Sequence, residues 1–177
     1  MPIASWPRAA RAATQSTRGR HGAQWHHRDR RRGPRATLQD AAAALIRGDV
    51  RSYLDLFVHA DDYTLVPPFG GEPRHGFDDS EHAVEQLSRF FTGGEAQVDV
   101  VQSYIAGECV VLVLIERQHG TVGGLPDQDW SLRVTMMFRR EGDDWRLVHR
   151  HADPLVREIN LRRAAELARG ERPPADG

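Results

Sequence analysis

Two histidines stand two residues apart in the stretch WRLVHRHADP, which covers residues 145–154. The stretch opens like a β-strand, and the side chains of a strand alternate between its two faces. His149 and His151 are therefore expected on the same face of a sheet. Neighbouring imidazoles can transfer protons near neutral pH, bind an anion or bind a metal, and they can also be plain polar groups on a hydrated face. The residues that share their face decide among these roles.

The strand predicted over residues 129–140 supplies the expected neighbours. If residues 141–143 form a three-residue loop, Thr135 pairs with His149, and Arg133 then pairs with His151 two positions along. A guanidinium can hold a carboxylate through two hydrogen bonds while an imidazole moves a proton. We therefore predict an anion or carbonyl site in which His149 and His151 are catalytic. Arg133 and Thr135 are predicted to bind the ligand.

Two alternatives to this site remain open. In the first, the same residues form a structural network in which either the backbone or Asp153 provides the hydrogen-bond partner of His151. In the second, a two-residue turn shifts the register by one and places His151 opposite Val134 instead.

Three further residues are candidates for the same site. Asp62 is predicted either as a catalytic pocket acid or as a cap before a strand. Tyr63 is predicted to line the ligand cavity or to pack in the core, and His75 to lie at the cavity rim or in a turn. A metal would need a third ligand beside the two strand histidines, from among Asp62, His75 and His119. We predict no metal and no cofactor.

The elements that must position these residues follow a helix-then-strand order. Helical spacing and capping residues predict helices over 37–48, 49–58 and 78–94, with Gly93 and Gly94 closing the third. Apolar alternation and turn signals predict strands over 62–68, 96–106, 109–119, 129–140 and 144–153, the third of them buried on both faces. A final helix is expected within 154–170. Helices followed by an antiparallel meander indicate an α+β fold.

The first 36 residues differ from the rest in charge. They hold nine arginines and a single acid, Asp29, whereas the whole chain of 177 residues has a formal net charge of −1. They show no hydrophobic period, so residues 1–36 are predicted to be a disordered basic extension. A basic tail can also bind phosphate groups, and this is the one way in which we expect contact with nucleic acid.

The order of elements resembles the nuclear transport factor 2-like superfamily, and two stretches carry the resemblance. ADDYTLVPPFGGEPRHG, residues 60–76, is similar to a stretch of the ketosteroid isomerases. FRREGDDWRLVHRHAD, residues 138–153, is similar to the end of SnoaL-like proteins and of the association domain of calcium/calmodulin-dependent protein kinase II. The resemblance covers residues 37–155, leaving 156–177 as a C-terminal helix and frayed tail. It implies a curved antiparallel sheet that forms a cone over three N-terminal helices, a cystatin-like α+β barrel.

The resemblance also bears on activity. The ketosteroid isomerases carry their general base directly before the proline of the first stretch, where this chain has Pro67, which cannot accept a proton. We predict a SnoaL-like small-molecule protein, an isomerase, cyclase or hydratase that uses His and Arg in the cone pocket. The alternative is a non-catalytic ligand-binding or oligomerisation module. An acid facing His149 across the pocket would favour the enzyme, and a pocket lined by arginines alone would favour binding.

Partners and location are predicted from composition and from one apolar face. A small ligand with an anionic or carbonyl group is expected, no run of apolar residues is long enough to span a membrane, and the single cysteine, Cys109, suits the cytoplasm. A homodimer is expected through one face of the strand at 129–140, unless a shifted register makes that face the interior. That face carries Trp130, Leu132, Val134, Met136 and Phe138.

Overall fold

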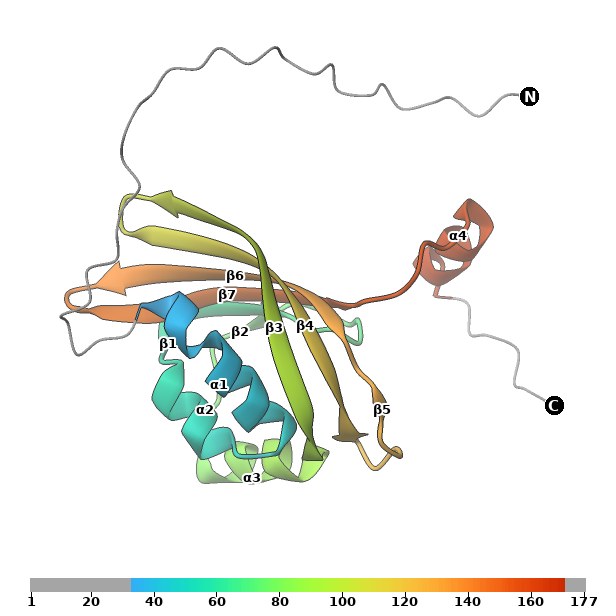
Figure 1. Cartoon of the computed structure of the whole chain (residues 1–177), viewed down its shortest axis with the longest axis horizontal. Coiled ribbons are helices and arrows are strands. Elements are labelled where there is room, and N and C mark those ends of the chain that lie inside the picture. Colours follow the sequence, from blue (N-terminus) through green and yellow to red (C-terminus); the bar gives the residue numbers. More distant parts are fainter. Residues whose placement is uncertain (1–32, 171–177) are drawn as a thin grey trace, which may run out of the picture. The chain divides into compact units, whose positions relative to one another are not determined.

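A computed structural model describes residues 33–170 of the chain (Figure 1). Its helices are α1 (Pro34–Ile46), α2 (Val50–Leu56), α3 (Glu81–Phe90) and α4 (Leu161–Ala168). Its strands are β1 (His59–Val66), β2 (Arg74–His75), β3 (Phe91–Ala106), β4 (Cys109–Val122), β5 (Gln128–Asp129), β6 (Leu132–Glu141) and β7 (Asp144–Pro154). The predicted α+β class is confirmed. The basic extension is predicted to be disordered over residues 1–36. Residues 1–32 of it lie outside the described part of the chain.

The helices begin where the sequence provides caps. Pro34 occupies the first turn of α1, where a missing N–H costs nothing. Asp49 accepts a hydrogen bond from the backbone N–H of Ser52 at 3.1 Å and so starts α2, as its position predicted. Ser80 plays the same part for α3, accepting from the N–H of Ala83 at 3.3 Å. These three helices cover one face of the sheet (Figure 1).

The sheet is curved and mixed. Its strands run in the order β2-β1-β7-β6-β4-β3, with β5 added to β4. All pairings are antiparallel except that of β1 with β7, which is parallel. The predicted antiparallel sheet is therefore correct for the meander from β3 to β7. It omitted the parallel contact that joins the N-terminal strand to the last one.

The two glycines predicted to close α3 lie within β3 instead. The helix ends at Phe90, and Phe91 is already extended. Gly94 has φ 147°, and a Cβ atom there would lie 2.1 Å from the carbonyl oxygen of His119. The glycine is thus required by a close approach of β3 to β4 and not by a helix terminus.

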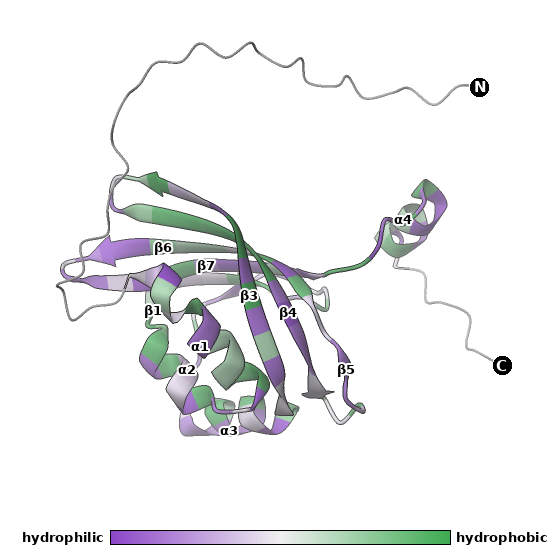
Figure 2. Ribbon diagram, viewed as in Figure 1, coloured by the Kyte–Doolittle hydropathy of each residue, from purple (hydrophilic) through white to green (hydrophobic). Residues whose placement is uncertain are grey.

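The hydrophobic core lies between the helices and the inner face of the sheet. Along β4, burial alternates between buried and half-buried, so the prediction that this strand is buried on both faces is wrong. Its hydropathy changes along its length, from apolar in the first half to polar toward the end (Figure 2). The change begins at Glu116, one of the few charged residues in the core region.

The apolar face of β6 is also part of this core. Leu132, Val134, Met136 and Phe138 are each at most 4 % exposed. The argument for a homodimer through this face is therefore wrong, because the fold itself covers it. Val101, Tyr104 and Ile105 on β3 are exposed large apolar residues, but the homodimer stays a prediction.

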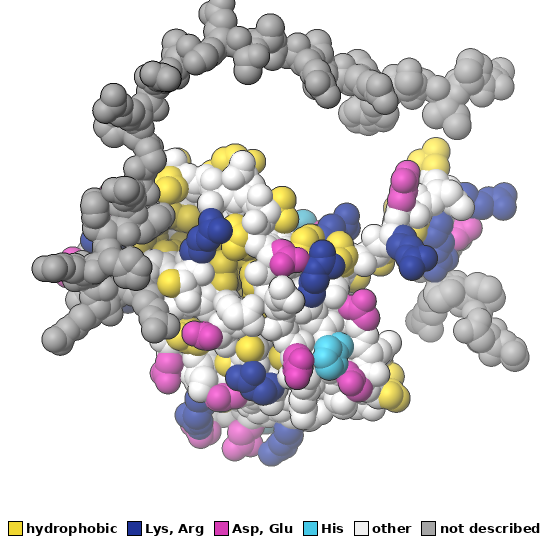
Figure 3. All heavy atoms as spheres, in the orientation of Figure 1, with side chains coloured by type: hydrophobic (Ala, Val, Ile, Leu, Met, Phe, Trp, Pro, Cys, Tyr) yellow, Lys and Arg dark blue, Asp and Glu magenta, His cyan; other side chains and the backbone are white. Residues whose placement is uncertain are grey.

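Over the helices, acidic and basic side chains are mixed (Figure 3).

The register of the last hairpin differs from the predicted one. Glu141 pairs with Asp144 across a two-residue turn, and Phe138 pairs with Leu147. The next pair is Met137 with His149, so Val148 is an extra residue that bulges from β7. Beyond the bulge, Thr135 pairs with His151 and Arg133 with Asp153. The two-residue turn considered as the alternative is therefore correct, but the bulge shifts the register by one more residue, so His151 faces Thr135 and not Val134.

The bulge decides which side chains of β7 point inward. Leu147 is fully buried, so a regular strand would also turn His149 and His151 toward the core. The extra residue reverses the alternation, and Arg150 and Ala152 point inward instead. The two histidines consequently lie on the outer face.

Candidate functional site

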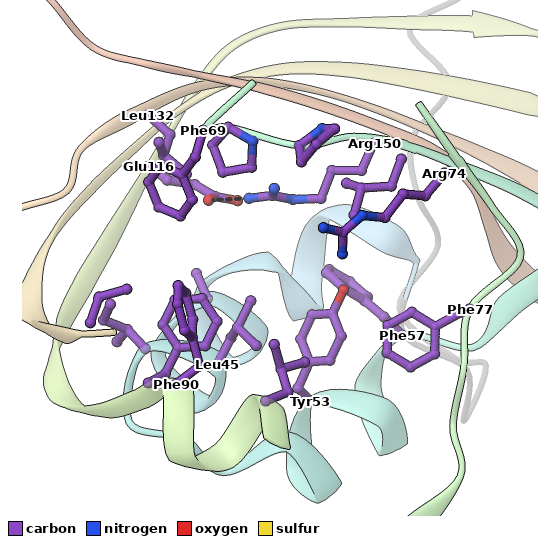
Figure 4. Close-up of a pocket in the computed structure, with 18 of the residues that line it drawn as sticks. Leu45, Tyr53, Phe57, Phe69, Arg74, Phe77, Phe90, Glu116, Leu132 and Arg150 are labelled. Carbon is purple, nitrogen blue, oxygen red and sulfur yellow. Dashed lines mark hydrogen bonds and ion pairs between the residues drawn. The ribbon is translucent and has the colours of Figure 1, made fainter. Parts of the chain in front are cut away.

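A cavity of about 690 Å³ lies between the helices and the inner face of the sheet. Aliphatic and aromatic side chains form most of its wall, and the labelled ones from the helices and from the sheet face each other across it (Figure 4). Its aromatic residues include Phe57, Phe69, Phe77, Phe90 and Trp130. The cavity is the place where a small organic molecule could be enclosed.

A buried ion pair is the most polar feature of this wall. Arg150 of β7 donates from Nη2 to Oε2 of Glu116 on β4 at 2.6 Å, and the two side chains are only 11 % and 9 % exposed. Burial lowers the pKa of Arg150, but the charge of Glu116, two nearby tyrosines and the hydrogen bond together raise it above its ordinary value. Arg150 is therefore charged at neutral pH inside a mainly apolar cavity.

Arg150 retains hydrogen-bonding capacity toward the cavity. A guanidinium has five N–H donors, and Glu116 is the one acceptor that it has within residues 33–170. In the same part of the chain, no fully buried side-chain nitrogen or oxygen lacks a partner. The remaining donors of Arg150 are therefore open to the cavity, where a ligand oxygen can accept from them.

Two tyrosines add neutral donors beside this arginine. Tyr53 of α2 and Tyr63 of β1 are 6 % and 2 % exposed. Burial raises the pKa of Tyr53 well above its ordinary value and that of Tyr63 to about 12, so both hydroxyls keep their protons at neutral pH. The Tyr53 hydroxyl lies 3.4 Å from Nε2 of His59.

His59 is enclosed by aromatic rings at the edge of the core. Its ring stacks on that of Phe77, with 4.0 Å between centroids and 12° between planes, and meets Tyr63 edge-on. Burial lowers the pKa of His59 to about 4, so its imidazole is neutral near pH 7. It can exchange a hydrogen bond with Tyr53 but carries no charge.

A second arginine reaches the cavity from β2. Arg74 pairs with Leu65 of β1, and Leu65 pairs with Arg150 of β7. These three residues form one row across the inner face of the sheet, and all three line the cavity. Asp78 also lines it, but its carboxylate accepts from the backbone N–H of Ser80 at 3.0 Å, and hydrogen bonds from Ser80 lower its pKa.

Among the residues predicted for the site, Tyr63 and His75 line the cavity. The four predicted from the last hairpin lie on the other face of the sheet. The bulge turns His149 and His151 outward, and Arg133 and Thr135 alternate with the buried apolar residues of β6. Nδ1 of His149 lies 2.7 Å from the Thr64 hydroxyl, and partial burial, with a smaller effect of His151, lowers the pKa of His149. The cavity positions predicted for His149, His151, Arg133 and Thr135 are therefore wrong.

Asp153 gathers two of these outer residues. Its Oδ2 lies 3.6 Å from Nε2 of His151 and 3.8 Å from Nη2 of Arg133. Thr135 is the cross-strand neighbour of His151. This arrangement corresponds to the structural network that the sequence left open as an alternative.

Asp62 also lies away from the cavity wall. Arg139 of β6 donates to both of its carboxylate oxygens, at 2.9 Å each, and these hydrogen bonds lower the pKa of Asp62. The carboxylate therefore holds β1 to β6, and its predicted position as a pocket acid is wrong.

The sequence did contain a signal for Glu116. It continues the inward alternation of Val110, Leu112 and Leu114 along β4, so it is a charged residue at a core position. Such a residue needs a buried partner. The signal for Arg150 was hidden, because only the bulge at Val148 turns it inward.

Neither a metal cluster nor a membrane span is present in the described residues. Between residues 33 and 170, no three His, Cys, Asp or Glu side chains are grouped so that they could hold a metal ion. None of the helices in that part is long and apolar enough to cross a membrane.

Comparison with known proteins identifies the family. A model of the SnoaL-like domain matches residues 35–156, whereas no curated protein matches the chain. Among solved structures, the chain is similar to a cystatin-like-fold protein from Caulobacter vibrioides (TM-score 0.52, 15 % identity, 77 % of this chain and 96 % of the other). It is also similar to a nuclear transport factor 2-like protein of unknown function in nutrient uptake from Rhodospirillum rubrum (TM-score 0.51, 21 % identity, 70 % and 96 %).

A third similar structure is a proposed dehydratase of the nuclear transport factor 2-like family from Streptomyces avermitilis (TM-score 0.50, 19 % identity, 70 % and 92 %). At these identities the structures share the fold of this chain and say nothing of its ligand. The family model covers well over half of the chain, and it spans the three helices and the whole sheet that enclose the cavity. The chain therefore belongs to the SnoaL-like domain family, with a nuclear transport factor 2-like fold.

Proposed function

We propose that the protein binds a small, largely apolar organic molecule in the cavity, with an oxygen atom of the ligand accepting hydrogen bonds from Arg150. The Glu116–Arg150 pair supports this more than any other observation. Two buried charges stabilise a fold poorly, and apolar residues of similar volume often serve as well or better. A pair whose arginine still has donors directed at an open cavity is better explained by a ligand than by stability.

The size and chemistry of the cavity agree with this proposal. A volume of about 690 Å³ lies within the range of small-molecule sites, which bury apolar ligand surface and orient it with a few polar groups. Arg150, Tyr53 and Tyr63 supply such groups, and all of them are donors.

Binding can be tested with the neutral fluorophore N-phenyl-1-naphthylamine, whose emission rises in apolar surroundings. We expect saturable enhancement with the wild-type protein. Ala83 lines the cavity from α3, so Ala83→Trp should fill part of the cavity and weaken binding by about tenfold. The matched control is Ala106→Trp at the exposed end of β3, which should bind as the wild type does. Equal binding by both variants, or none by the wild type, would overturn the proposal.

An acid–base enzyme is the second candidate, and the position of Glu116 favours it. A carboxylate that shares the cavity wall with two protonated tyrosines provides a base and a donor for an isomerase, cyclase or hydratase. The base would then be Glu116, in place of the histidines predicted from the sequence. Exchange of carbon-bound protons of a bound ketone for deuterium, followed by NMR and abolished in Glu116→Gln, would support this chemistry.

A further inference from the structure

We infer that the ligand carries a carboxylate, and that Arg74 and Arg150 bind this group together. The inference rests on the proposed ligand cavity and adds the chemical class of its occupant. It assigns a binding role to Arg74, a residue on the two-residue strand β2.

The sheet places the two arginines on one row. One strand separates β2 from β7, so the Cα atoms of Arg74 and Arg150 are about 10 Å apart, twice the spacing of neighbouring strands. Both side chains lie on the inner face, with Leu65 between them. Both guanidinium groups point into the cavity, and the Tyr53 hydroxyl is directed toward them from the helices (Figure 4). An arginine side chain is long enough for both to reach one group between them.

The charges on the cavity wall leave Arg74 without a counter-ion. Two carboxylates line the cavity besides the two arginines, and each already has its own donor. Glu116 accepts from Arg150, and Asp78 accepts from the N–H of Ser80. Arg74 makes no hydrogen bond and no ion pair with any residue of the described chain from 33 to 170. An anion entering the cavity could therefore accept hydrogen bonds from all the N–H groups of Arg74 and from those of Arg150 that do not bind Glu116.

The charge and the apolar character of the wall favour a carboxylate among the anions that a guanidinium can bind. A guanidinium presents its N–H groups in a planar fork that matches the two oxygens of a carboxylate. The rest of the wall is apolar and aromatic, so the remainder of the ligand must be apolar as well. A dianionic phosphate ester would bring a second charge that this wall does not match, because Glu116 already occupies part of Arg150.

The test compares two competitors of the same shape and different charge. 2-Naphthoate and 2-naphthamide are each used to displace N-phenyl-1-naphthylamine from the protein at neutral pH. We expect the carboxylate to displace it at a concentration lower by about tenfold, as one charge-assisted contact would give. Arg74→Gln should remove most of this preference, measured in that variant as the ratio of the two displacing concentrations. Arg89→Gln, at an arginine of α3 that does not line the cavity, is the matched control and should retain the preference.

A second variant is expected to raise the preference for the carboxylate instead of lowering it. Glu116→Gln releases Arg150 from its carboxylate, so the preference for 2-naphthoate should increase in that variant. If the fluorophore binds but both naphthalene competitors displace it equally, the carboxylate inference is wrong and the cavity proposal stands. A preference that survives in Arg74→Gln, or falls equally in Arg89→Gln, also overturns the role of Arg74. If the fluorophore does not bind at all, the proposed function itself fails.

Discussion

The two faces of β7 carry adjacent charged or titratable residues in contrasting environments. On the inner face, Arg150 is buried with Glu116 in the cavity wall. On the outer face, His151 and Asp153 are 45 % and 49 % exposed and meet at 3.6 Å. One bulge residue, Val148, determines which of these residues lies on which face. Residue type alone therefore did not locate the candidate site: Arg150 is buried in the cavity wall, whereas the histidines lie on the outer face.

Removal of the inner charge is expected to have the largest effect on stability. Arg150→Met leaves Glu116 buried without a partner, and we expect it to lower the free energy of unfolding by about 3–5 kcal/mol. Arg133→Met removes a charge from the outer face, where the side chain is 56 % exposed, and should cost about 0.5 kcal/mol or less. Urea unfolding followed by circular dichroism measures both.

A double variant separates lost charge from lost packing. Arg150→Met combined with Glu116→Met replaces the pair by apolar side chains and should recover most of the lost stability. Equal losses for Arg150→Met and Arg133→Met would show that the inner and outer charges do not differ in the way proposed.

The next largest effect is the pH dependence of stability that the enclosed His59 contributes. Burial lowers the pKa of His59 from the ordinary 6.5 to about 4. Between these two values the unfolded chain takes up the proton and the folded chain does not, so stability falls as pH falls through that window. We expect His59 alone to contribute a loss of roughly 2–3 kcal/mol between pH 6.5 and pH 4.

The contribution of His59 is measured as the difference from a variant that cannot titrate there. His59→Gln keeps a hydrogen-bonding partner for Tyr53 and should show a shallower fall in unfolding free energy over the same pH range. His151→Gln is measured in parallel, because it removes an exposed imidazole of the outer face. Identical slopes for the wild type and His59→Gln would show that His59 is not enclosed as described.

Sequence patterns predicted the fold well because they report local choices. Asp49 caps α2 as expected, and the alternation of β6 predicted an apolar face. The patterns failed where a long-range approach decided the structure. Gly94 looked like a helix stop, and only the neighbouring strand β4 shows why glycine is needed there.

The site was harder to predict than the fold for a related reason. Glu116 could have been recognised as a charge at an inward position of β4. Arg150 could not, since one inserted residue reverses the faces of a strand and no residue type marks Val148 as a bulge. Tyr63 and His75 were predicted at the cavity or its rim as one of two alternatives each, and neither prediction depends on the register of the last hairpin.

Deletion of Val148 tests the role of the bulge. The deletion makes the alternation regular again while it keeps Leu147, Arg150 and Ala152 on the inner face. We therefore expect a folded protein that still binds N-phenyl-1-naphthylamine, with a stability loss of about 1–2 kcal/mol from adjustment of the neighbouring strands. Deleting Arg146, on the other side of Leu147, is the control for shortening β7. Loss of fluorophore binding in a folded Val148 deletion would contradict the inferred bulge.

The smallest effect is expected on the outer face, at the contact between His149 and Thr64. Their side chains meet at 2.7 Å across the parallel pair of β1 and β7, in a half-buried position. His149→Ala should lower the free energy of unfolding by about 0.5–1.5 kcal/mol, the net contribution of one hydrogen bond. Thr64→Val tests the same contact from its other side, and the double variant should lose less than the sum of the two single losses. Both single variants should bind N-phenyl-1-naphthylamine as the wild type does, because neither residue lines the cavity. A large loss of binding in His149→Ala, with the fold intact by circular dichroism, would show that the imidazole belongs to the site. The two faces of β7 would then not differ as described.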